Sequence, residues 1–196
     1  MRSFQHLPAA ARVARPWKNG GGTMTDVLVS PPGARLDAFE WRISIARVEG
    51  SGPFSMFPGI DRSMAILEGA GLTLEIAGAA PATLTERSPP LAFAGDVATS
   101  ARLIGGPVTD LNVMTHRGRV AHRMQRLDLS PGLPLTRDLA QAVLVWGDGT
   151  GSIAAPDGIV HPALHDALWI EAPARVTMAA VTPATAYLIE LLGPAA

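Results

Sequence analysis

Cysteine is absent from this chain of 196 residues, and neither sign of charge is in excess. Without cysteine there are no disulfides, no thiolate metal ligands and no cysteine nucleophile. The 16 basic side chains nearly balance the 17 acidic ones, so the composition gives no electrostatic basis for binding nucleic acid or an anionic membrane surface. No segment has the apolar length of a membrane span or a secretory signal. We therefore expect a cytoplasmic protein that binds neither nucleic acid nor membranes.

Long helical segments are scarce as well, because 17 prolines and 20 glycines interrupt the chain. What remains are short apolar or alternating runs that end at Gly, Pro or Asp, such as "FEWRISIARV", "SMAILEGAGLTLEI", "AVLVWGDGTGSI" and "TAYLIELL". Such runs predict an all-β sandwich or barrel. The most helix-like segments are "TRDLAQAVLVW" and "HPALHDAL", and both are short.

A weak internal repeat indicates two similar β modules in the chain. Shifting the sequence by 78 residues places Gly69 on Gly147, Gly71 on Gly149 and Met114 on Leu192. In this interpretation the first module kept polar groups that the second module lost. We assign the first module to residues 1–118 and the second, degenerate module to residues 119–196.

Several strings in the first half of the chain carry a family signature, namely "PWKNGGGTMTDV", "FEWRISIARV", "GPFSMFPGIDRSMAILEGAGLTL", "FAGD" and "GGPVTDLNVMTHRG". Together they resemble the HutD/Ves family of bacterial cupin-like proteins over residues 16–118. The resemblance implies an all-β bicupin fold, in which two jelly-roll-like barrels share one chain. It also implies an association with histidine degradation and no established catalytic activity.

Most cupins hold a metal ion through two short motifs, and the ligands of those motifs are missing here. With Gly50 and Gly69 as the framework glycines of the first motif, its ligand positions are occupied by Met56, Pro58 and Arg62. The second motif places Gly106 at the histidine position and Asp110 at the asparagine position. A guanidinium repels a divalent cation, and a metal ion prefers imidazole and carboxylate ligands. We therefore expect no metal and no other cofactor.

Strand parity leaves the environment of the polar side chains open. In "WRISIA" the side chains of Arg42 and Ser44 share one face, and in "DLNVM" Asp110, Asn112 and Met114 share one face. Alternation alone favours a solvent-facing polar side. The family resemblance instead favours a polar lining inside the barrel.

If these side chains line the interior, they form a site for a small organic anion. Arginine forks bind carboxylates, while aromatic side chains supply apolar walls. The triple glycine after Asn19 would let the entering strand bend near the barrel mouth. The expected ligand-binding residues are Trp17, Lys18, Asn19, Arg42, Ser44, Phe54, Phe57, Asp61, Arg62, Asn112, Met114 and His116.

Other interpretations of these residues stay open. Phe54 and Phe57 also suit an ordinary core, and Asp61 next to Arg62 is typical of a surface ion pair. His161 and His165 have the spacing of two zinc ligands on a helix, but no third ligand is near them in the sequence.

The sequence favours a metal-free cupin that binds a small carboxylate metabolite and senses or modulates histidine degradation. Urocanate and a formylated amino acid are the ligands that the resemblance implies. The alternative is a metal-independent isomerase or lyase that uses His116 or Asp61 as its base. Whether the chain forms a homodimer is left open.

Overall fold

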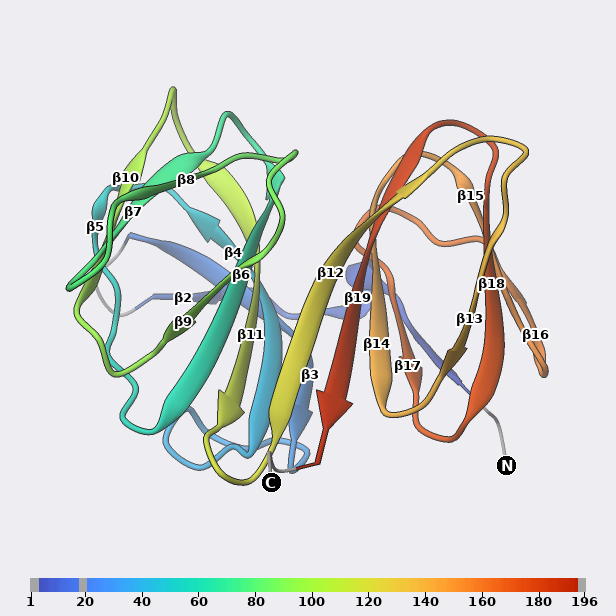
Figure 1. Ribbon diagram of the computed structural model, residues 1–196, viewed down its shortest axis with the longest axis horizontal. Coiled ribbons are helices and arrows are strands. Elements are labelled where there is room, and N and C mark those ends of the chain that lie inside the picture. The colour runs from blue at the N-terminus through green and yellow to red at the C-terminus, as the bar shows by residue number, and fades with distance from the viewer. Residues whose placement is uncertain (1–3, 18–20, 194–196) are drawn as a thin grey trace. The chain divides into compact units, whose positions relative to one another are not determined.

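The computed structural model describes residues 4–17 and 21–193, and its regular structure consists of β-strands with one short 3₁₀ turn, Ala9–Ala11 (Figure 1). The all-β expectation is therefore confirmed. The helix-like segment 136–146 forms parts of two strands, β13 (Leu135–Leu139) and β14 (Ala142–Asp148). The segment 161–168 is a turn that leads into β17 (Ala167–Ile170). No helix among the described residues is long and apolar enough to span a bilayer.

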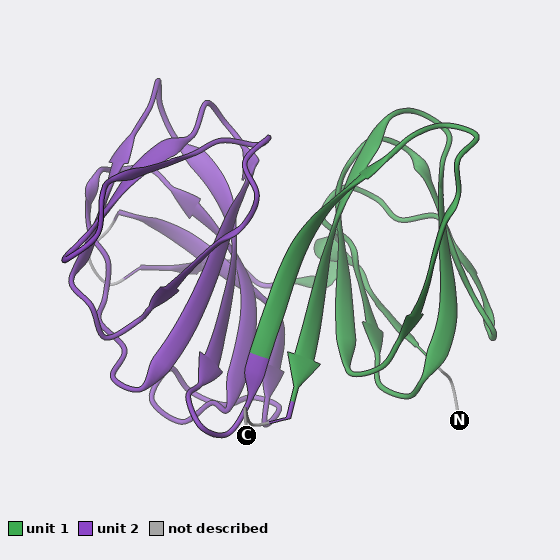
Figure 2. Ribbon diagram, in the orientation of Figure 1, with its two compact units in different colours: residues 1–12, 122–192 green, residues 13–121, 193–196 purple. Residues whose placement is uncertain are grey.

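The chain divides into two compact units, which Figure 2 colours separately. We call Val13–Ala121 the N-terminal unit. The C-terminal unit consists of His122–Leu192 together with the segment that ends at Arg12. The first strand, β1 (Gln5–Leu7), pairs with β17 (Ala167–Ile170), so the beginning of the chain completes a sheet of the C-terminal unit. The boundary expected after residue 118 would place β1 and β17 in different modules.

The N-terminal unit contains two antiparallel sheets. The larger has the order β2 (Arg15–Pro16), β3 (Gly22–Ser30), β4 (Trp41–Val48), β11 (Val108–His116), β6 (Ile60–Glu68), β9 (Leu91–Ala94). The smaller has the order β5 (Gly52–Pro53), β10 (Thr99–Leu103), β7 (Leu72–Ile76), β8 (Ala82–Leu84). One apolar core joins them, because Met64 and Ile66 of the larger sheet belong to the same buried cluster as Leu72 and Leu74 of the smaller.

The C-terminal unit also contains two sheets. The larger has the order β1, β17, β14 (Ala142–Asp148), β19 (Ala184–Leu192), β12 (Ala121–Leu129). The smaller has the order β13 (Leu135–Leu139), β18 (Ala174–Ala180), β15 (Gly151–Ala155), β16 (Gly158–Val160). Within the described residues the named sheets of a unit remain separate, so the expected closed barrels are not observed.

Both units use the same strand order. The arrangement β11-β6-β9 with β10-β7-β8 recurs as β19-β14-β17 with β18-β15-β16. A β-bulge fixes the residue correspondence in the N-terminal unit, because Thr109 pairs with Glu68 while Asp110 pairs with Ile66, and Leu67 is skipped.

The C-terminal unit carries a bulge at the same place, where Thr185 pairs with Asp148 while Ala186 pairs with Trp146, and Gly147 is skipped. Superposing the two bulges gives these pairs of equivalent positions: Arg62 and Ala142, Asp110 and Ala186, Asn112 and Leu188, Met114 and Glu190. The single shift of 78 residues had placed Met114 on Leu192. It fails locally because the loops between equivalent strands differ in length.

Candidate ligand-binding site

A row of polar side chains is buried on the three central strands of the larger N-terminal sheet. We call it the polar row: Arg42 and Ser44 on β4, Arg62 on β6, Asp110 and Asn112 on β11, none more than 7% exposed. The register places Ser44 and Met64 on either side of Asn112, and Met64 belongs to the apolar core between the two sheets. The polar parity of these strands therefore faces the interior and not the solvent.

Three phenylalanine rings surround the guanidinium of Arg62. Its Cζ atom lies 5.3 Å from the ring centroid of Phe54, 5.8 Å from that of Phe57 and 5.0 Å from that of Phe93. Such contacts stabilise a cation through the negative face of the ring. Nε of Arg62 donates a hydrogen bond of 3.3 Å to Oδ1 of Asn112. Burial lowers the pKa of Arg62 to about 10, so the side chain stays charged at neutral pH.

Backbone contacts hold these rings in place. Phe93 lies directly opposite Arg62 in the pairing of β9 with β6. The backbone N–H of Phe57 donates to the carbonyl of Gly95 over 2.8 Å, and that of Phe54 donates to the carbonyl of Thr99 over 2.9 Å. A Cβ atom at Gly95 would lie 3.2 Å from Cδ of Arg62 and 2.9 Å from a backbone oxygen, so only glycine fits beside the arginine without displacement.

Asp110 is the buried acid whose charge interacts with that of Arg62. It is 1% exposed, and burial raises its pKa to about 7, against the opposing effects of the Arg62 charge and a hydrogen bond with Asn112. Sequence parity had placed Asp110 on the same face as Asn112, but Asp110 and Phe93 were not among the expected ligand-binding residues. The sequence feature that could have identified Asp110 is its alternation with Asn112 on one strand face. For Phe93 it is the position within the "FAGD" string of the family signature.

Arg42 differs from Arg62 because a carboxylate neutralises it. Its Nη2 lies 2.6 Å from Oδ1 of Asp26 on β3, and the arginine is 3% exposed. Met114 lies between the two arginines in the register and packs in a small cluster with Phe39 and Ile60. Arg62 is therefore the arginine of the polar row without a carboxylate ion pair among the described residues.

Asp61 is the second residue of β6 and His116 is the last residue of β11, at an end of the sheet that we call the rim. Oδ1 of Asp61 is 2.8 Å from Nη2 of Arg117, whose Nη1 lies 2.9 Å from Oδ2 of Asp96. All three side chains are substantially exposed. Alternation along β6 sends Asp61 and Arg62 to opposite faces, so the alternative of an Asp61–Arg62 ion pair is not observed. Nδ1 of His116 hydrogen-bonds the carbonyl oxygen of Arg117.

The glycine-rich segment leads into β3, and the residues at its two ends are described. Trp17 packs, half-buried, against the apolar core of the N-terminal unit. At Gly22 a Cβ atom would lie 2.1 Å from the carbonyl oxygen of Arg47, so the strand approaches its neighbour as closely as only glycine allows. The expected contributions of Lys18 and Asn19 lie outside the described residues.

The histidine pair of the C-terminal unit does not form a metal site on a helix. Nδ1 of His161 hydrogen-bonds the carbonyl of Gly151, while His165 adopts a positive φ of 62° in a turn. The neighbouring Asp166 binds Nε2 of His6 over 2.8 Å. Nowhere in residues 4–17 and 21–193 do three or more His, Cys, Asp or Glu side chains gather to hold a metal ion.

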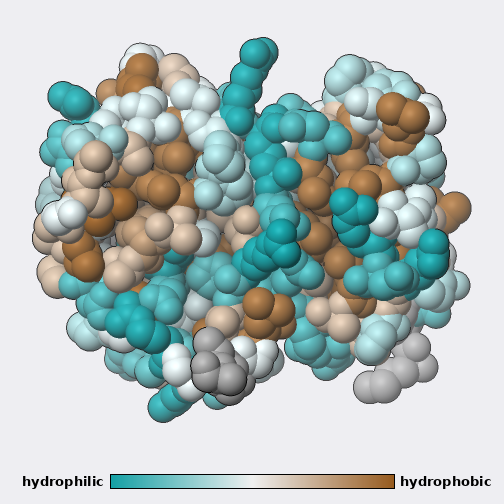
Figure 3. All heavy atoms as spheres, viewed as in Figure 1, coloured by the Kyte–Doolittle hydropathy of each residue, from teal (hydrophilic) through white to brown (hydrophobic). Residues whose placement is uncertain are grey.

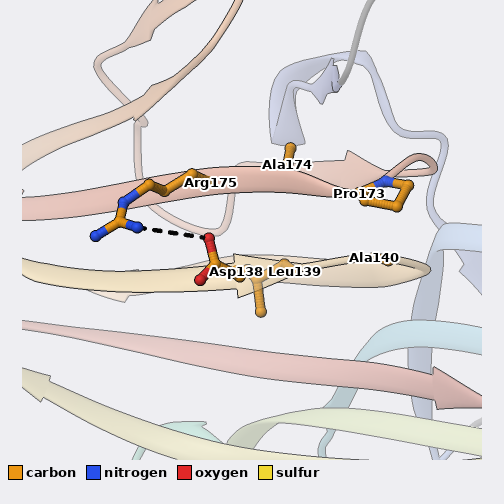
Figure 4. A pocket seen from close by; sticks show the side chains of 6 residues that line it. All are labelled: Asp138, Leu139, Ala140, Pro173, Ala174 and Arg175. Atoms are coloured by element: carbon orange, nitrogen blue, oxygen red, sulfur yellow. Dashed lines mark ion pairs between the residues drawn. The ribbon is translucent and has the colours of Figure 1, made fainter.

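The surface of the described residues shows weaker candidate binding sites than the polar row. An open hollow in the C-terminal unit lies beside β13 and β18, and its main polar feature is a weak ion pair of 4.0 Å between Arg175 and Asp138 (Figure 4). Both side chains are more than 70% exposed. On the face drawn in Figure 3, apolar side chains gather over part of the N-terminal unit. The polar row is therefore the stronger candidate for a site.

The profile of the HutD family matches residues 9–188 of this chain. The chain belongs to the HutD family. This confirms the resemblance found in the sequence strings.

The HutD-family relatives include two proteins matched over part of their length. The chain is 41% identical to the protein Ves of Citrobacter koseri over 113 residues, which cover 57% of this chain and 58% of Ves. It is 38% identical over 128 residues to an uncharacterised 21.2 kDa protein in the hutC 3′ region of Pseudomonas putida, covering 65% of this chain and 66% of that protein.

Solved structures resemble the HutD-family chain over nearly its whole length. A conserved protein of unknown function from Pseudomonas aeruginosa PAO1 is 31% identical, with a TM-score of 0.88 and coverage of 98% of this chain and 100% of the other. HutD from Pseudomonas fluorescens SBW25, solved in a formate condition, is 30% identical with the same coverage and a TM-score of 0.78. The protein Ylba of E. coli is 12% identical over 95% of this chain and 90% of its own, with a TM-score of 0.74, and shows the fold alone.

Proposed function

We propose that this HutD-family protein binds a small carboxylate metabolite at Arg62 without a metal ion. The observation that carries the proposal is the state of Arg62, a 7% exposed cation whose described side-chain hydrogen bond uses Nε alone. The fork formed by its two Nη groups has the geometry that binds a carboxylate through two parallel hydrogen bonds. The phenylalanine rings supply the apolar walls that such sites usually have.

The residues at the cupin ligand positions support a metal-free site. Met56 is 57% exposed, Pro58 is exposed, and Arg62 brings a buried positive charge to the third position. A divalent cation would be repelled there and would find no imidazole or carboxylate among these three side chains. We infer that the two units descend from two cupin modules and that residues 119–196 form the degenerate one, since both units share one strand order and one bulge.

We place this activity in histidine degradation, with urocanate or a formylated amino acid as the ligand and sensing or modulation of the pathway as its consequence. The family match and the position of the P. putida relative in the hutC 3′ region support this placement. The protein would act in the cytoplasm, with a small anionic metabolite as its partner.

A thermal-shift screen over carboxylates of histidine degradation tests the proposal. A ligand at a hundred times its Kd stabilises the folded state by about 2.7 kcal/mol. Arg62→Met should abolish that stabilisation, because losing one partner of a buried charge pair costs about 2–5 kcal/mol of affinity. Arg62→Lys should restore only part, since lysine keeps the charge without the fork.

The matched control is Arg102→Met, which removes an exposed arginine from the same unit. It should leave the ligand-induced shift unchanged. Near-ultraviolet circular dichroism should show that the Arg62→Met protein is folded. Normal binding by folded Arg62→Met would contradict the proposal.

One observation favours the alternative, a metal-independent isomerase or lyase. A buried carboxyl whose pKa lies at about 7 is suited to general acid–base catalysis, and Asp110 has these properties and interacts with the charge of Arg62. Asp110, instead of His116 or Asp61, would then carry the proton. NMR distinguishes the two functions, because a binding protein returns its metabolite intact after long incubation. Turnover that disappears in Asp110→Asn would establish the enzyme.

A further inference from the structure

Asp110 is a buried acid that carboxylate binding by Arg62 does not by itself explain. Its Oδ1 atom has no hydrogen-bond partner within the described part of the chain, although the residue is 1% exposed. An unpaired carboxylate oxygen in an apolar interior costs free energy, so such a group calls for a physical reason. The equivalent position of the C-terminal unit is occupied by Ala186 in the same bulge, so the shared fold does not require an acid there.

Among the described residues around Asp110, Arg62 is the cation that no carboxylate ion pair neutralises. On β6, Ile66 lies directly opposite, and Arg62 is the cation whose charge acts on the Asp110 carboxyl. On β4, Ala46 lies opposite, and the cation further along that strand, Arg42, is paired with Asp26. Across the core, β7 and β10 contribute apolar side chains, namely Leu72, Leu74 and Ala101.

Asn112 connects Asp110 with Arg62. Its Oδ1 accepts a hydrogen bond from Nε of Arg62, and Asn112 also hydrogen-bonds the Asp110 carboxyl. Since its carbonyl oxygen is used by the arginine, its amide N–H groups are the donors left for Asp110. The acid, the amide and the cation thus form one buried chain of contacts.

A bound carboxylate at Arg62 and an ionised Asp110 would be two anions near one buried cation of the described residues, Arg62 itself. In a low-dielectric interior two anions near one cation do not both stay charged without a large cost. We propose that a small carboxylate binds at Arg62 together with one proton, which Asp110 takes up. The inference rests on the proposed function, because it requires an anion at Arg62.

This coupling sets the pH dependence of binding. In the free protein burial holds the pKa of Asp110 at about 7, and the charge of a bound carboxylate raises it further. Below pH 7 the acid is already protonated, so the Kd should be nearly constant. Above pH 7 each binding event takes up a proton, and the Kd should rise by up to about tenfold per pH unit.

Formate is the appropriate probe because it keeps its negative charge throughout this pH range. Its Kd is measured by NMR at pH 6 and pH 8, and its proton uptake by calorimetry at pH 8 in two buffers of different ionisation enthalpy. The wild-type protein should take up close to one proton per formate at pH 8 and should bind about tenfold more weakly than at pH 6. Asp110→Asn should bind formate with no uptake and with the same Kd at both pH values.

The matched control is Asp138→Asn, an exposed acid of the C-terminal unit, which should behave as the wild type. Formate binding without proton uptake in the wild type overturns the inference and leaves the proposed function standing. Uptake that persists in Asp110→Asn also overturns it. If formate and the pathway carboxylates fail to bind at every pH, both the inference and the proposed function fall.

Discussion

The two units share a strand order and a bulge, but their interiors differ in polarity. In the described part of the N-terminal unit the buried polar residues are Arg42, Ser44, Arg62, Ser63, Thr99, Thr109, Asp110, Asn112 and Thr115. In that of the C-terminal unit they are Asp166 and Thr185. At the positions equivalent to Arg62, Asp110 and Asn112, the C-terminal unit has Ala142, Ala186 and Leu188, all at most 2% exposed.

This difference separates what the fold needs from what a site needs. The C-terminal unit builds the same pairing around Trp146 and Leu144, both fully buried, with apolar neighbours. Buried charges are destabilising unless they are well paired. The polar row is therefore not required by the strand order, and its presence in one unit alone supports the binding function proposed above.

The largest expected effect comes from moving the acid into the apolar unit. Ala186→Asp places an unpaired carboxylate at a 0% exposed position, and an uncompensated buried charge typically costs about 3–5 kcal/mol. Urea unfolding at pH 8 measures the loss. Ala186→Asn has nearly the same volume without the charge and should lose less. Equal losses for the two variants would show that volume, and not polarity, distinguishes the two interiors.

Removing the buried charge from the N-terminal unit by Asp110→Asn should stabilise that unit. Because burial raises the pKa of Asp110 to about 7, its stabilising contribution is complete below the ordinary aspartate pKa and is lost as the pH rises through 7. Asp110→Asn removes this loss, so its advantage over the wild type should grow from pH 4 to pH 8 and reach roughly 1–3 kcal/mol. Urea unfolding across this range measures it, and a constant difference would contradict the assigned titration.

Part of this picture was available in the sequence. Short runs bounded by Gly and Pro predicted the all-β fold, and the family strings predicted the HutD assignment. Alternation placed Arg42 and Ser44 on one face of their strand, and Asp110 and Asn112 on one face of another strand. It did not decide between solvent and interior, because both environments produce the same period of two.

Other features could not be predicted from the sequence, because they depend on which strands pair in the folded protein. The position of Phe93 over Arg62 depends on the pairing of β9 with β6, and the neutralisation of Arg42 depends on Asp26 from another strand. The neighbours Asp61 and Arg62 looked like a pair in sequence, but a strand sends adjacent side chains to opposite faces. The pairing of β1 with β17 joins residues more than 150 positions apart, and no local pattern predicts it.

A smaller effect is expected at the buried acid of the C-terminal unit. The pKa of Asp166 lies below its usual value. Burial alone would raise it, but hydrogen bonds from Ala9 N–H, His6 and Ala163 N–H together have the larger, opposite effect. The resulting stability is present above the ordinary aspartate pKa and is lost as the pH falls below it. Asp166→Asn should cost about 1–2 kcal/mol at pH 7 and less at pH 3.

Hydrogen exchange locates the effect of Asp166→Asn, because Asp166 ties the segment after β1 to the turn before β17. Amides of β1 should exchange faster in the variant, while those of β4 and β11 should be unchanged. Asp138→Asn is the control, since that acid is exposed. Unchanged β1 protection would mean that strand pairing alone holds the N-terminal segment.

The smallest effect is expected at the rim, where Arg117 joins Asp61 and Asp96 in an exposed network. Hydrogen bonds from Arg117 and from Gly59 N–H lower the pKa of Asp96 to about 2, so the network stabilises the fold above the ordinary aspartate pKa and loses this effect as the pH falls towards 2. Arg117→Gln should lower the Tm slightly at pH 6, less at pH 3 and less in 1 M salt, because salt screens exposed charges. Arg35→Gln, which removes another exposed ion pair, is the control. The affinity for formate should be the same in Arg117→Gln as in the wild type. The backbone bond from Phe57 to Gly95 does not involve Arg117, so the Phe57 ring should keep its place over Arg62. A loss of affinity as large as that of Arg62→Met would instead place the site at the rim, and the interior polar row would no longer distinguish the two units by function.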